Sequence, residues 1–517
     1  MVELQDSPVR SPFVSAQAAE IGQWLRSQLA DGATLCCDSR AVRAGDAFFA
    51  MPGLRTDGRK FIDQAIARGA AAVIVEQSEG QAPETGAVPC RQIKGLAAQA
   101  GQIASQFHGR PSEQLQVVAV TGTNGKTSVS QWIAQGLAAR GQQTAVIGTL
   151  GCGPVDALEA GSYTTPDALQ TQALLADFAV RGIDTVSMEA SSIGLHQGRV
   201  NGTRIPVAVY TNLSRDHLDY HDSMDEYAAS KALLFGWPGL QSVVINGDDE
   251  FSPRMLAAAV AGAGDTLPLR IVYGFAPSQF GARGDAVLLA ERMEQTDDGV
   301  SFVLSGDYGR SEVRLSLLGA FNVSNVLAVA GCWLAMGVSF DQVVGQLEQL
   351  RAVPGRLQMI RRPGAPLAVV DYAHTPDALS NVLSALRPVA DARGGALWCL
   401  FGAGGDRDPG KRPLMGMVAE GAADQLVITS DNPRSETPFR IVSDIRAGLT
   451  REPRLTELDR RAAIEAALRL AAPADVVLIA GKGHELYQEI ATGRQPFSDV
   501  AIAGQALDRR LQEHADV

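Results

Sequence analysis

The sequence predicts an α/β protein of several domains, in which short strands alternate with helices. Its 517 residues are too many for one hydrophobic core and are typical of about three or four folding units. Short apolar runs recur along the chain. Each is followed by a glycine-rich or polar turn and then by a stretch rich in alanine and leucine. This order of signals is typical of the α/β class.

Composition and charge argue against two classes of partner. The chain has 45 Lys and Arg against 57 Asp and Glu, a formal net charge of −12, and no basic tail. We therefore expect no nucleic-acid partner. The longest apolar runs, such as 476–480, have the length of a strand, so no membrane insertion is expected. The first residues lack the pattern of a signal peptide and the six cysteines lack metal-ligand spacing, which predicts a cytoplasmic protein.

Two linker-like segments divide the chain into three predicted domains. They are His108-Gly-Arg-Pro111 and Val353-Pro-Gly-Arg356, which give domains at residues 1–110, 111–352 and 353–517. The first domain is expected to contain a strand–helix–strand unit at 47–75. Strands of the other two domains are expected at 115–120, 145–148, 185–189, 207–211, 242–246, 368–371, 397–402, 425–430 and 476–480.

A phosphate-binding loop opens the second domain. Thr121-Gly-Thr-Asn-Gly-Lys-Thr-Ser128 follows an apolar strand and precedes a predicted helix at 129–140. Glycines let backbone N–H groups approach phosphates, Lys126 supplies a positive charge, and the Thr127 hydroxyl is placed to coordinate Mg²⁺. The full Walker pattern has glycine where this chain has Val120, so only the shorter core matches. A chance glycine-rich turn is the alternative, which the Lys-Thr pair disfavours. The predicted ATP contacts are Gly122, Thr123, Asn124, Gly125, Lys126, Thr127 and Ser128.

Acidic and histidine residues after later strands suggest a metal site. Glu189 ends an apolar strand, where a carboxylate beside the phosphate loop suits Mg²⁺. His217 and His221 are four residues apart, close enough to share one face of a helix. Such histidines also fit a hydrolase metal cluster, but the Gly-Lys-Thr loop favours phosphoryl transfer.

Taken together, the motifs resemble the Mur ligase family. TGTNGKTS, EASS, NLSRDHLDYH, KALLF, GAFNVSNVLAV and DYAHTPD occur in this order, and the resemblance covers essentially the whole chain. It implies a three-domain architecture with an N-terminal UDP-sugar-binding domain, a central P-loop ATPase domain and a C-terminal Rossmann-like domain. It also implies that ATP converts a substrate carboxylate into an acyl phosphate, which an amine then attacks.

The resemblance assigns catalytic and metal-binding roles. Lys126, His217 and Lys231 are expected to be catalytic, and Lys231 matches the lysine that family members carbamylate with CO₂. As carboxylysine it would hold Mg²⁺ together with Thr127, Glu189 and His217. The alternative is that Lys231 is an ordinary exposed cation. ATP, Mg²⁺ and this carbamate are thus the expected cofactors.

Further nucleotide and UDP-sugar contacts follow from the same resemblance. Asn325 matches an adenine-side contact, and Arg356 and Asp371 match nucleotide contacts made on domain closure, whereas Asn322 is interpreted as a helix cap. Leu54-Arg-Thr56 is assigned to the substrate. The expected contacts with the UDP-muramoyl dipeptide are Ser39, Thr164, Thr165, Ser191, Gln197 and Arg199.

The third domain carries the residues expected to select the amino acid. Asp431-Asn-Pro-Arg434 follows a predicted strand at its carboxyl end, where α/β folds bind ligands. Arg434 and Arg407 can each bind a carboxylate through a guanidinium, which suits diaminopimelate because lysine lacks its distal carboxylate. The segment alone is a reasonable turn. With GGDRDPGKRP and GKGHE, however, it resembles the diaminopimelate-adding members, and Glu485 could hold the ammonium group. The expected contacts are Arg407, Asp431, Asn432, Pro433, Arg434, Gly481 and Glu485.

The resemblance, together with these residues, therefore implies a ligase acting on small molecules, which adds meso-diaminopimelate to UDP-N-acetylmuramoyl-L-Ala-D-Glu and is expected to be a monomer. A folylpolyglutamate synthase shares the phosphate loop but is disfavoured by the Asp-Asn-Pro-Arg and Asp38-Ser-Arg40 signatures. A P-loop switch or transport ATPase would not need paired arginines in a third domain. A non-catalytic scaffold would not need to keep Lys126, Thr127, Glu189, His217 and Lys231.

Overall fold

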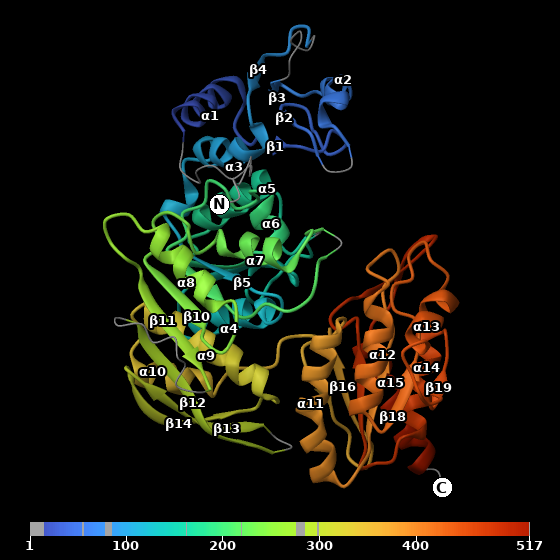
Figure 1. Cartoon of the computed structure of the whole chain (residues 1–517). Helices are drawn as coiled ribbons and strands as arrows, with labels where there is room; N and C mark the ends of the chain where they lie inside the picture. Colours follow the sequence, from blue (N-terminus) through green and yellow to red (C-terminus); the bar gives the residue numbers. More distant parts are fainter. Residues whose placement is uncertain are drawn as a thin grey trace.

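The computed structural model describes residues 15–53, 56–77, 85–161, 163–218, 220–275, 285–296 and 299–515, with side chains up to residue 512. Over these residues the chain forms sheets of four, ten, six and two strands. Figure 1 shows the 4-stranded sheet at the top, the 10-stranded sheet below it and the 6-stranded sheet to the side. Helices alternate with most of the strands, and most neighbouring strands are parallel, which confirms the expected α/β class. Leu54 and Arg55 of the expected substrate segment lie outside the described residues.

The N-terminal sheet is parallel, with the order β1-β2-β3-β4. Phe49 of β2 packs with α1 and α3 on one face, and Phe48 packs with Ile62 of α2 on the other. Because both faces are covered, every residue of β2 is buried. The elements are α1 (Ala16–Gln28), β1 (Leu35–Cys36), β2 (Ala47–Ala50), a 3₁₀ turn (Gly58–Phe61), α2 (Ile62–Ala67), β3 (Ala72–Glu76), β4 (Cys90–Ile93), α3 (Leu96–Phe107) and a second 3₁₀ turn (Pro111–Glu113).

The central sheet has the order β14-β13-β12-β11-β10-β9-β5-β8-β6-β7, and β5 lies parallel between β8 and β9. Alternate residues of β5 enter two cores: Val118 packs on the side of α4 and α9, and Val117 on the side of α5. The strands are β5 (Gln116–Thr121), β6 (Thr144–Gly148), β7 (Gly151–Pro154), β8 (Thr185–Glu189), β9 (Val207–Tyr210), β10 (Ser242–Asn246), β11 (Leu269–Gly274), β12 (Ala286–Gln295), β13 (Val300–Gly306) and β14 (Gly309–Leu315). The helices are α4 (Lys126–Ala138), α5 (Ala168–Val180), α6 (Ser192–His196), α7 (Met224–Ala232), α8 (Ser252–Ala261), α9 (Ala320–Ala335) and α10 (Phe340–Leu347).

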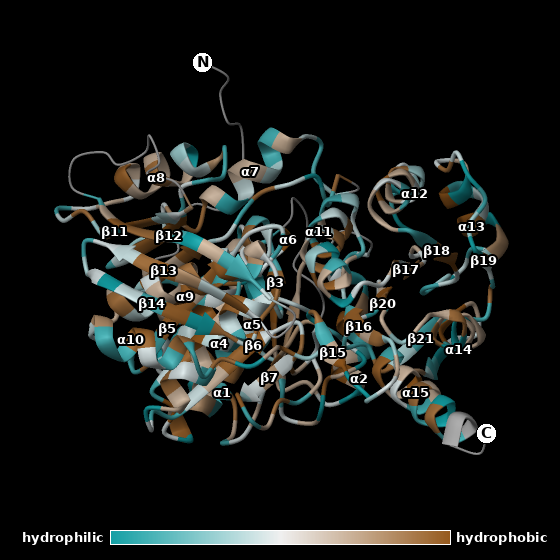
Figure 2. Cartoon of the chain, turned by 90° about the horizontal axis from the view of Figure 1, so that it is seen from below, coloured by the Kyte–Doolittle hydropathy of each residue, from teal (hydrophilic) through white to brown (hydrophobic). Residues whose placement is uncertain are grey.

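The C-terminal sheet has the order β15-β16-β20-β17-β18-β19, with β15 antiparallel to β16 and the other pairs parallel. One core joins it to α11, α12 and α13, and another to α14 and α15. In Figure 2 the hydrophobic colouring gathers on the strands between these helix layers. The elements are β15 (Gln358–Ile360), β16 (Leu367–Asp371), α11 (Pro376–Arg393), β17 (Leu397–Phe401), α12 (Lys411–Ala422), β18 (Gln425–Ile428), α13 (Pro438–Arg446), β19 (Leu455–Thr456), α14 (Arg460–Leu470), β20 (Val476–Ala480), β21 (Tyr487–Ile490), β22 (Gly493–Pro496) and α15 (Asp499–Ala515).

The strands predicted for the second and third domains are present, with ends shifted by at most about two residues. The strand–helix–strand unit at 47–75 is also present. The expected helix cap at Asn322 is wrong: α9 is capped by Gly319, and Asn322 lies in the first turn, where its Nδ2 donates to Leu318 O at 2.9 Å. The domain boundaries at 110 and 352 stay predictions. None of the helices in the described ranges is long and apolar enough to span a membrane.

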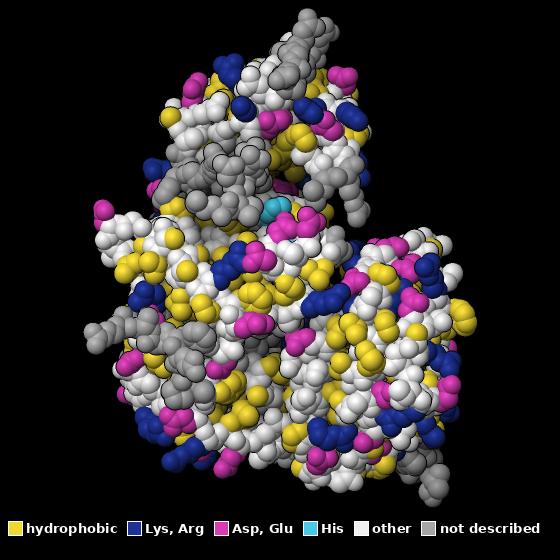
Figure 3. Space-filling model, in the orientation of Figure 1, with side chains coloured by type: hydrophobic (Ala, Val, Ile, Leu, Met, Phe, Trp, Pro, Cys, Tyr) yellow, Lys and Arg dark blue, Asp and Glu magenta, His cyan; other side chains and the backbone are white. Residues whose placement is uncertain are grey.

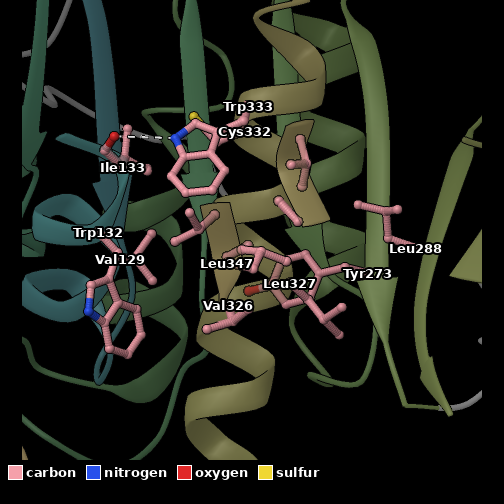
Figure 4. Close-up of a cluster of buried hydrophobic side chains, with 14 of the residues drawn as sticks. Val129, Trp132, Ile133, Tyr273, Leu288, Val326, Leu327, Cys332, Trp333 and Leu347 are labelled. Carbon is pink, nitrogen blue, oxygen red and sulfur yellow. Dashed lines mark hydrogen bonds between the residues drawn. The ribbon is translucent and has the colours of Figure 1, made fainter. Parts of the chain in front are cut away.

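Two tryptophans anchor α4 in the core, one through α9 and one through the segment after α10 (Figure 4). Trp132 Nε1 donates to Arg351 O at 2.7 Å, and Trp333 Nε1 donates to Ile133 O at 3.2 Å. The helices approach closely because Gly136 has no side chain. A Cβ atom there would lie 1.9 Å from Trp333 Cζ2.

Gly136→Ala should therefore lower the free energy of unfolding by about 1–3 kcal/mol, the usual effect of overpacking a filled core. Gly345→Ala in α10 is the matched control, because a Cβ there meets nothing within 4 Å; it should be neutral or slightly stabilising. Urea unfolding followed by tryptophan fluorescence measures both. Equal midpoints for the two variants would contradict the packing assigned to Gly136.

Candidate functional site

The phosphate loop joins β5 to α4 and requires glycine at two positions. Gly125 adopts a left-handed φ of 86°, and a Cβ on it would lie 2.3 Å from Asn325 Oδ1 of α9. A Cβ on Gly122 would lie 1.8 Å from Thr211 Oγ1, just after β9. Side chains from two neighbouring elements thus press against the loop backbone, which explains the residue type at both positions.

The partly buried Lys126 and the buried Lys231 converge beneath this loop. Lys126 Nζ donates to Gly122 O at 2.8 Å and to Thr123 O at 2.9 Å, and Lys231 Nζ donates to the same Gly122 O at 2.8 Å. Burial lowers the pKa of Lys126, an effect opposed by the charge of Glu189. Burial, and then the charge of Lys126, lower the pKa of Lys231 well below its usual value. Lys231 is 1% exposed, so the alternative of an ordinary exposed cation is wrong.

Oxygen donors suitable for Mg²⁺ lie beside the loop. Glu189 Oε2 accepts from Thr127 Oγ1 and from Thr149 Oγ1, both at 3.1 Å, and Glu189 Oε1 accepts from Thr149 N at 2.8 Å. Hard oxygen ligands of this kind fit Mg²⁺, which commonly completes its shell with substrate phosphates and water. Among the described residues, no group of three or more His, Cys, Asp and Glu side chains could hold a metal by itself. The donor set therefore fits a nucleotide-bound Mg²⁺ better than a closed protein site.

His217 and His221 do not share a helical face, and that expectation is wrong. They lie in the segment between β9 and α7, and His217 has a left-handed φ of 55°. His217 Nε2 lies 3.6 Å from Asp216 Oδ2, and burial lowers the pKa of His217 to about 4 despite the nearby carboxylate. A neutral imidazole of this kind can serve as a metal ligand. His221 instead pairs with Ser192 Oγ at 3.0 Å through Nε2.

A cavity of about 590 Å³ opens above the phosphate loop, between the central and C-terminal domains. Its size is in the range of small-molecule sites. From the C-terminal side Arg356 Nη2 donates to Thr127 Oγ1 at 3.2 Å. Asp371 accepts from two backbone N–H groups, and burial raises its pKa although Arg356 opposes the shift. The cavity lining includes Thr123, Asn124, Gly125, Lys126, Thr127, Ser128, Glu189, His217, Asn325, Arg356 and Asp371.

Asp377 also links the two domains at this cavity. Its Oδ2 accepts from Asn124 Nδ2 and from Ser214 Oγ, both at 3.0 Å. Sequence reasoning missed this residue because an acidic side chain in the first turn of a helix ordinarily interacts only with the helix dipole. Figure 3 shows the C-terminal domain seated against the central domain, with charged side chains of both signs at the junction.

Five of the residues expected to bind the UDP-muramoyl dipeptide lie together. Thr165 Oγ1 donates to Ser191 Oγ at 3.1 Å, Arg199 Nη1 donates to Thr165 O at 2.8 Å, and Arg199 Nε donates to Gln197 Oε1 at 2.9 Å. Thr164 Oγ1 lies 3.0 Å from Thr149 Oγ1, which is bonded to Glu189. The group thus extends up to the oxygen donors described above.

Ser39 lies in the N-terminal domain rather than in this group. Its Oγ donates to Gln64 Oε1 at 2.7 Å, and the side chain is buried. Nearby in sequence, Cys37 interacts with Asp167 of the central domain, and burial raises the pKa of the Cys37 thiol.

The residues expected to bind the amino acid gather at the carboxyl ends of β18 and β20. A Cβ on Gly481 would lie 2.3 Å from Asp431 Oδ2, and Asn432 Nδ2 donates to Glu485 Oε2 at 2.8 Å. A Cβ on Gly404 would lie 2.9 Å from Arg434 Nη1 and 3.7 Å from Arg407 Cγ, so the two arginines flank one glycine. Pro433 lies in the same loop.

Glu485 is already engaged by a residue that sequence reasoning did not select. The fully buried Lys482 donates from Nζ to Glu485 Oε2 at 2.8 Å and to Asn432 Oδ1 at 2.9 Å. Its position within Gly-Lys-Gly-His-Glu was the available signal, but only the structure brings Lys482 to Asn432.

Family sequence models match three segments of the chain. A model described as "Mur ligase family, catalytic domain" matches residues 33–108, the "Mur ligase middle domain" matches 120–333, and "Mur ligase, glutamate ligase domain" matches 355–483. These segments coincide with the three large sheets.

Curated relatives match nearly the whole chain. A protein of Ralstonia nicotianae named UDP-N-acetylmuramoyl-L-alanyl-D-glutamate–2,6-diaminopimelate ligase is 47% identical over 509 residues, covering 97% of this chain and 98% of the relative. One of the same name from Pseudomonas aeruginosa is 49% identical over 483 residues, covering 93% and 96%. A solved structure with that name aligns with a TM-score of 0.65 and 38% identity over 92% of this chain and 95% of its own.

Proposed function

The chain belongs to the Mur ligase family, and from this premise we propose that it joins meso-diaminopimelate to UDP-N-acetylmuramoyl-L-Ala-D-Glu at the expense of ATP. Near-complete alignment with relatives named for this activity is the observation that carries the proposal. The flanking of Gly404 by Arg434 and Arg407 supports the amino-acid assignment, because two guanidinium groups suit a substrate with an extra carboxylate.

The reaction begins with transfer of the γ-phosphoryl group of ATP to an oxygen of the D-Glu carboxylate, giving an acyl phosphate and ADP. Activation is needed because a carboxylate is a poor electrophile. The loop N–H groups and Lys126 hold the phosphates, and Arg356 adds positive charge from the other domain. Thr127, Glu189 and His217 would hold a Mg²⁺ ion, which would supply positive charge to neutralise the phosphates.

The amine of diaminopimelate then attacks the carbonyl carbon of the acyl phosphate. The tetrahedral intermediate collapses with loss of inorganic phosphate and of the amine proton, which leaves the amide. Domain contacts through Asp377 and Arg356 hold the amino-acid site beside the acyl phosphate, so catalysis is mostly positioning. We propose that the enzyme works as a cytoplasmic monomer whose partners are these small molecules.

We further propose that Lys231 works as its carbamate. Its buried position and lowered pKa favour the neutral amine, which is the form that adds CO₂. The product keeps an N–H that can donate to Gly122 O and gains two oxygens able to join Thr127, Glu189 and His217 around Mg²⁺.

Lys231→Ala should be nearly inactive, with a loss on the order of 100-fold or more in kcat, and Lys231→Glu should recover part of it by restoring a carboxylate. Native enzyme prepared without CO₂ should lose activity and regain it with bicarbonate. Steady-state assays measure each effect, and thermal unfolding checks that the variants are folded. An active Ala variant and no bicarbonate response would contradict the carbamate.

Amino-acid selectivity tests the proposed substrate. The native chain should use diaminopimelate far better than L-lysine, since lysine has no distal carboxylate to accept hydrogen bonds from the Arg434 and Arg407 guanidinium groups. Arg434→Ala should lower kcat/KM for diaminopimelate by about 30- to 1,000-fold, because a charge-assisted bond is worth on the order of 2–4 kcal/mol when its loss leaves the partner unpaired. Lysine should be affected much less. Equal losses would make Arg434 structural, and a native preference for lysine would overturn the substrate assignment.

A further inference from the structure

A two-stranded hairpin supports the amino-acid site from outside the matched family segments. β21 and β22 form the hairpin at 487–496, beyond the match that ends at residue 483. Gln488 Nε2 donates to Asp431 O at 2.6 Å, and Glu489 N donates to Asn432 Oδ1 at 2.9 Å. Arg434 N donates back to Glu489 O at 3.1 Å. The Asp-Asn-Pro-Arg loop is therefore bound along most of its length to β21.

The Glu489 side chain adds a contact of a different kind, because it reaches the guanidinium of Arg434. Arg434 Nε donates to Glu489 Oε2 at 3.1 Å, and Arg434 Nη1 donates to Gly405 O at 2.7 Å. These bonds hold two of the three guanidinium nitrogens in place. Within the described part of the chain, Nη2 makes no hydrogen bond, so it stays available for a ligand.

The backbone conformation and the partial exposure of Arg434 both make the hydrogen bonds to its guanidinium important. Arg434 has a left-handed φ of 52°, which is uncommon for a residue with a side chain. The side chain is 24% exposed and that of Glu489 is 33% exposed. A partly exposed arginine without a partner would sample many rotamers, and binding would have to restrict them.

Glu489 does not cancel the positive charge of the site. Arg494, from β22, lies 3.9 Å from Glu489 Oε1, and its guanidinium lies 4.1 Å over the ring of Tyr487. One carboxylate is thus shared by Arg434 and Arg494, while Arg407 flanks Gly404 nearby.

From these contacts we propose that Glu489 is a positioning residue: it fixes the direction of the Arg434 guanidinium and so sets the preference for an amino acid with a distal carboxylate. The proposal rests on the proposed function, since it concerns the same amino-acid site. Glu489 acts through Arg434 and does not itself touch the substrate. Removing it should cost binding of the distal carboxylate and leave the chemical step intact, because the ATP site is built from other residues.

The test uses Glu489→Ala, Glu489→Gln, Arg434→Ala and the double variant in the full-length enzyme, at saturating ATP and UDP-muramoyl dipeptide. Glu489→Ala should raise KM for diaminopimelate about 5- to 10-fold with kcat within about twofold, the effect of freeing one rotamer-rich side chain. Glu489→Gln keeps an acceptor oxygen and should retain most of the preference. The KM for ATP and the rate with L-lysine should not change.

Two controls separate positioning from a structural role. Glu452→Ala removes an exposed partner of Arg446 in the same domain and should change nothing. If Glu489 acts only through Arg434, then Arg434→Ala combined with Glu489→Ala should be no worse than Arg434→Ala alone. The backbone bonds of residue 489 persist in every variant, so thermal unfolding should shift little.

Additive losses in the double variant, or equal losses for diaminopimelate and lysine, would overturn the positioning role. An unchanged KM for diaminopimelate in Glu489→Ala would do the same. Failure of the proposed function would look different, because the native enzyme would then show no preference for diaminopimelate before any residue is changed.

Discussion

The site depends on the convergence of two lysine amino groups on one carbonyl oxygen. Lys126 and Lys231 both donate to Gly122 O, and Arg356 reaches the same loop from another domain. Lys126 and Arg356 bring positive charges together partly away from water, which is unfavourable unless anions compensate them. Glu189 provides one nearby negative charge. The phosphates of ATP would supply the rest, so the folded chain presents a region whose charge is balanced when nucleotide binds.

The surrounding architecture serves this arrangement. β5, β8 and β9 end side by side, so that the phosphate loop, Glu189 and the segment carrying His217 meet at one edge of the central sheet. In the C-terminal domain, Asp371 at the end of β16 and Asp377 at the start of α11 line the same cavity. Its amino-acid loop follows β18. The proposed nucleotide and amino-acid contacts thus lie at the carboxyl edges of parallel sheets, where backbone ends and helix N-termini leave donors available.

The sequence predicts those strands and loops that are determined by a local pattern of residue types. Strands such as β5 are recognisable because both faces are buried and residues 117–120 are all apolar, and the phosphate loop because its glycines are required by close contacts. The sequence does not predict features that depend on the packing of segments far apart in the chain. The His217 backbone is left-handed within an irregular segment, which no periodicity signals. Asp377 contacts Asn124 across 253 positions, and Glu489 contacts Arg434 across 55. Individually such carboxylates look like ordinary surface residues.

The most direct test of the account follows an oxygen atom. The proposed acyl phosphate forms when a D-Glu carboxylate oxygen attacks the γ-phosphorus of ATP, and that oxygen must leave with the phosphate when the amine attacks. UDP-N-acetylmuramoyl-L-Ala-D-Glu labelled with ¹⁸O in this carboxylate should therefore give inorganic phosphate carrying one ¹⁸O for each amide formed, measured by mass spectrometry. Unlabelled phosphate, or label in AMP, would contradict activation through an acyl phosphate.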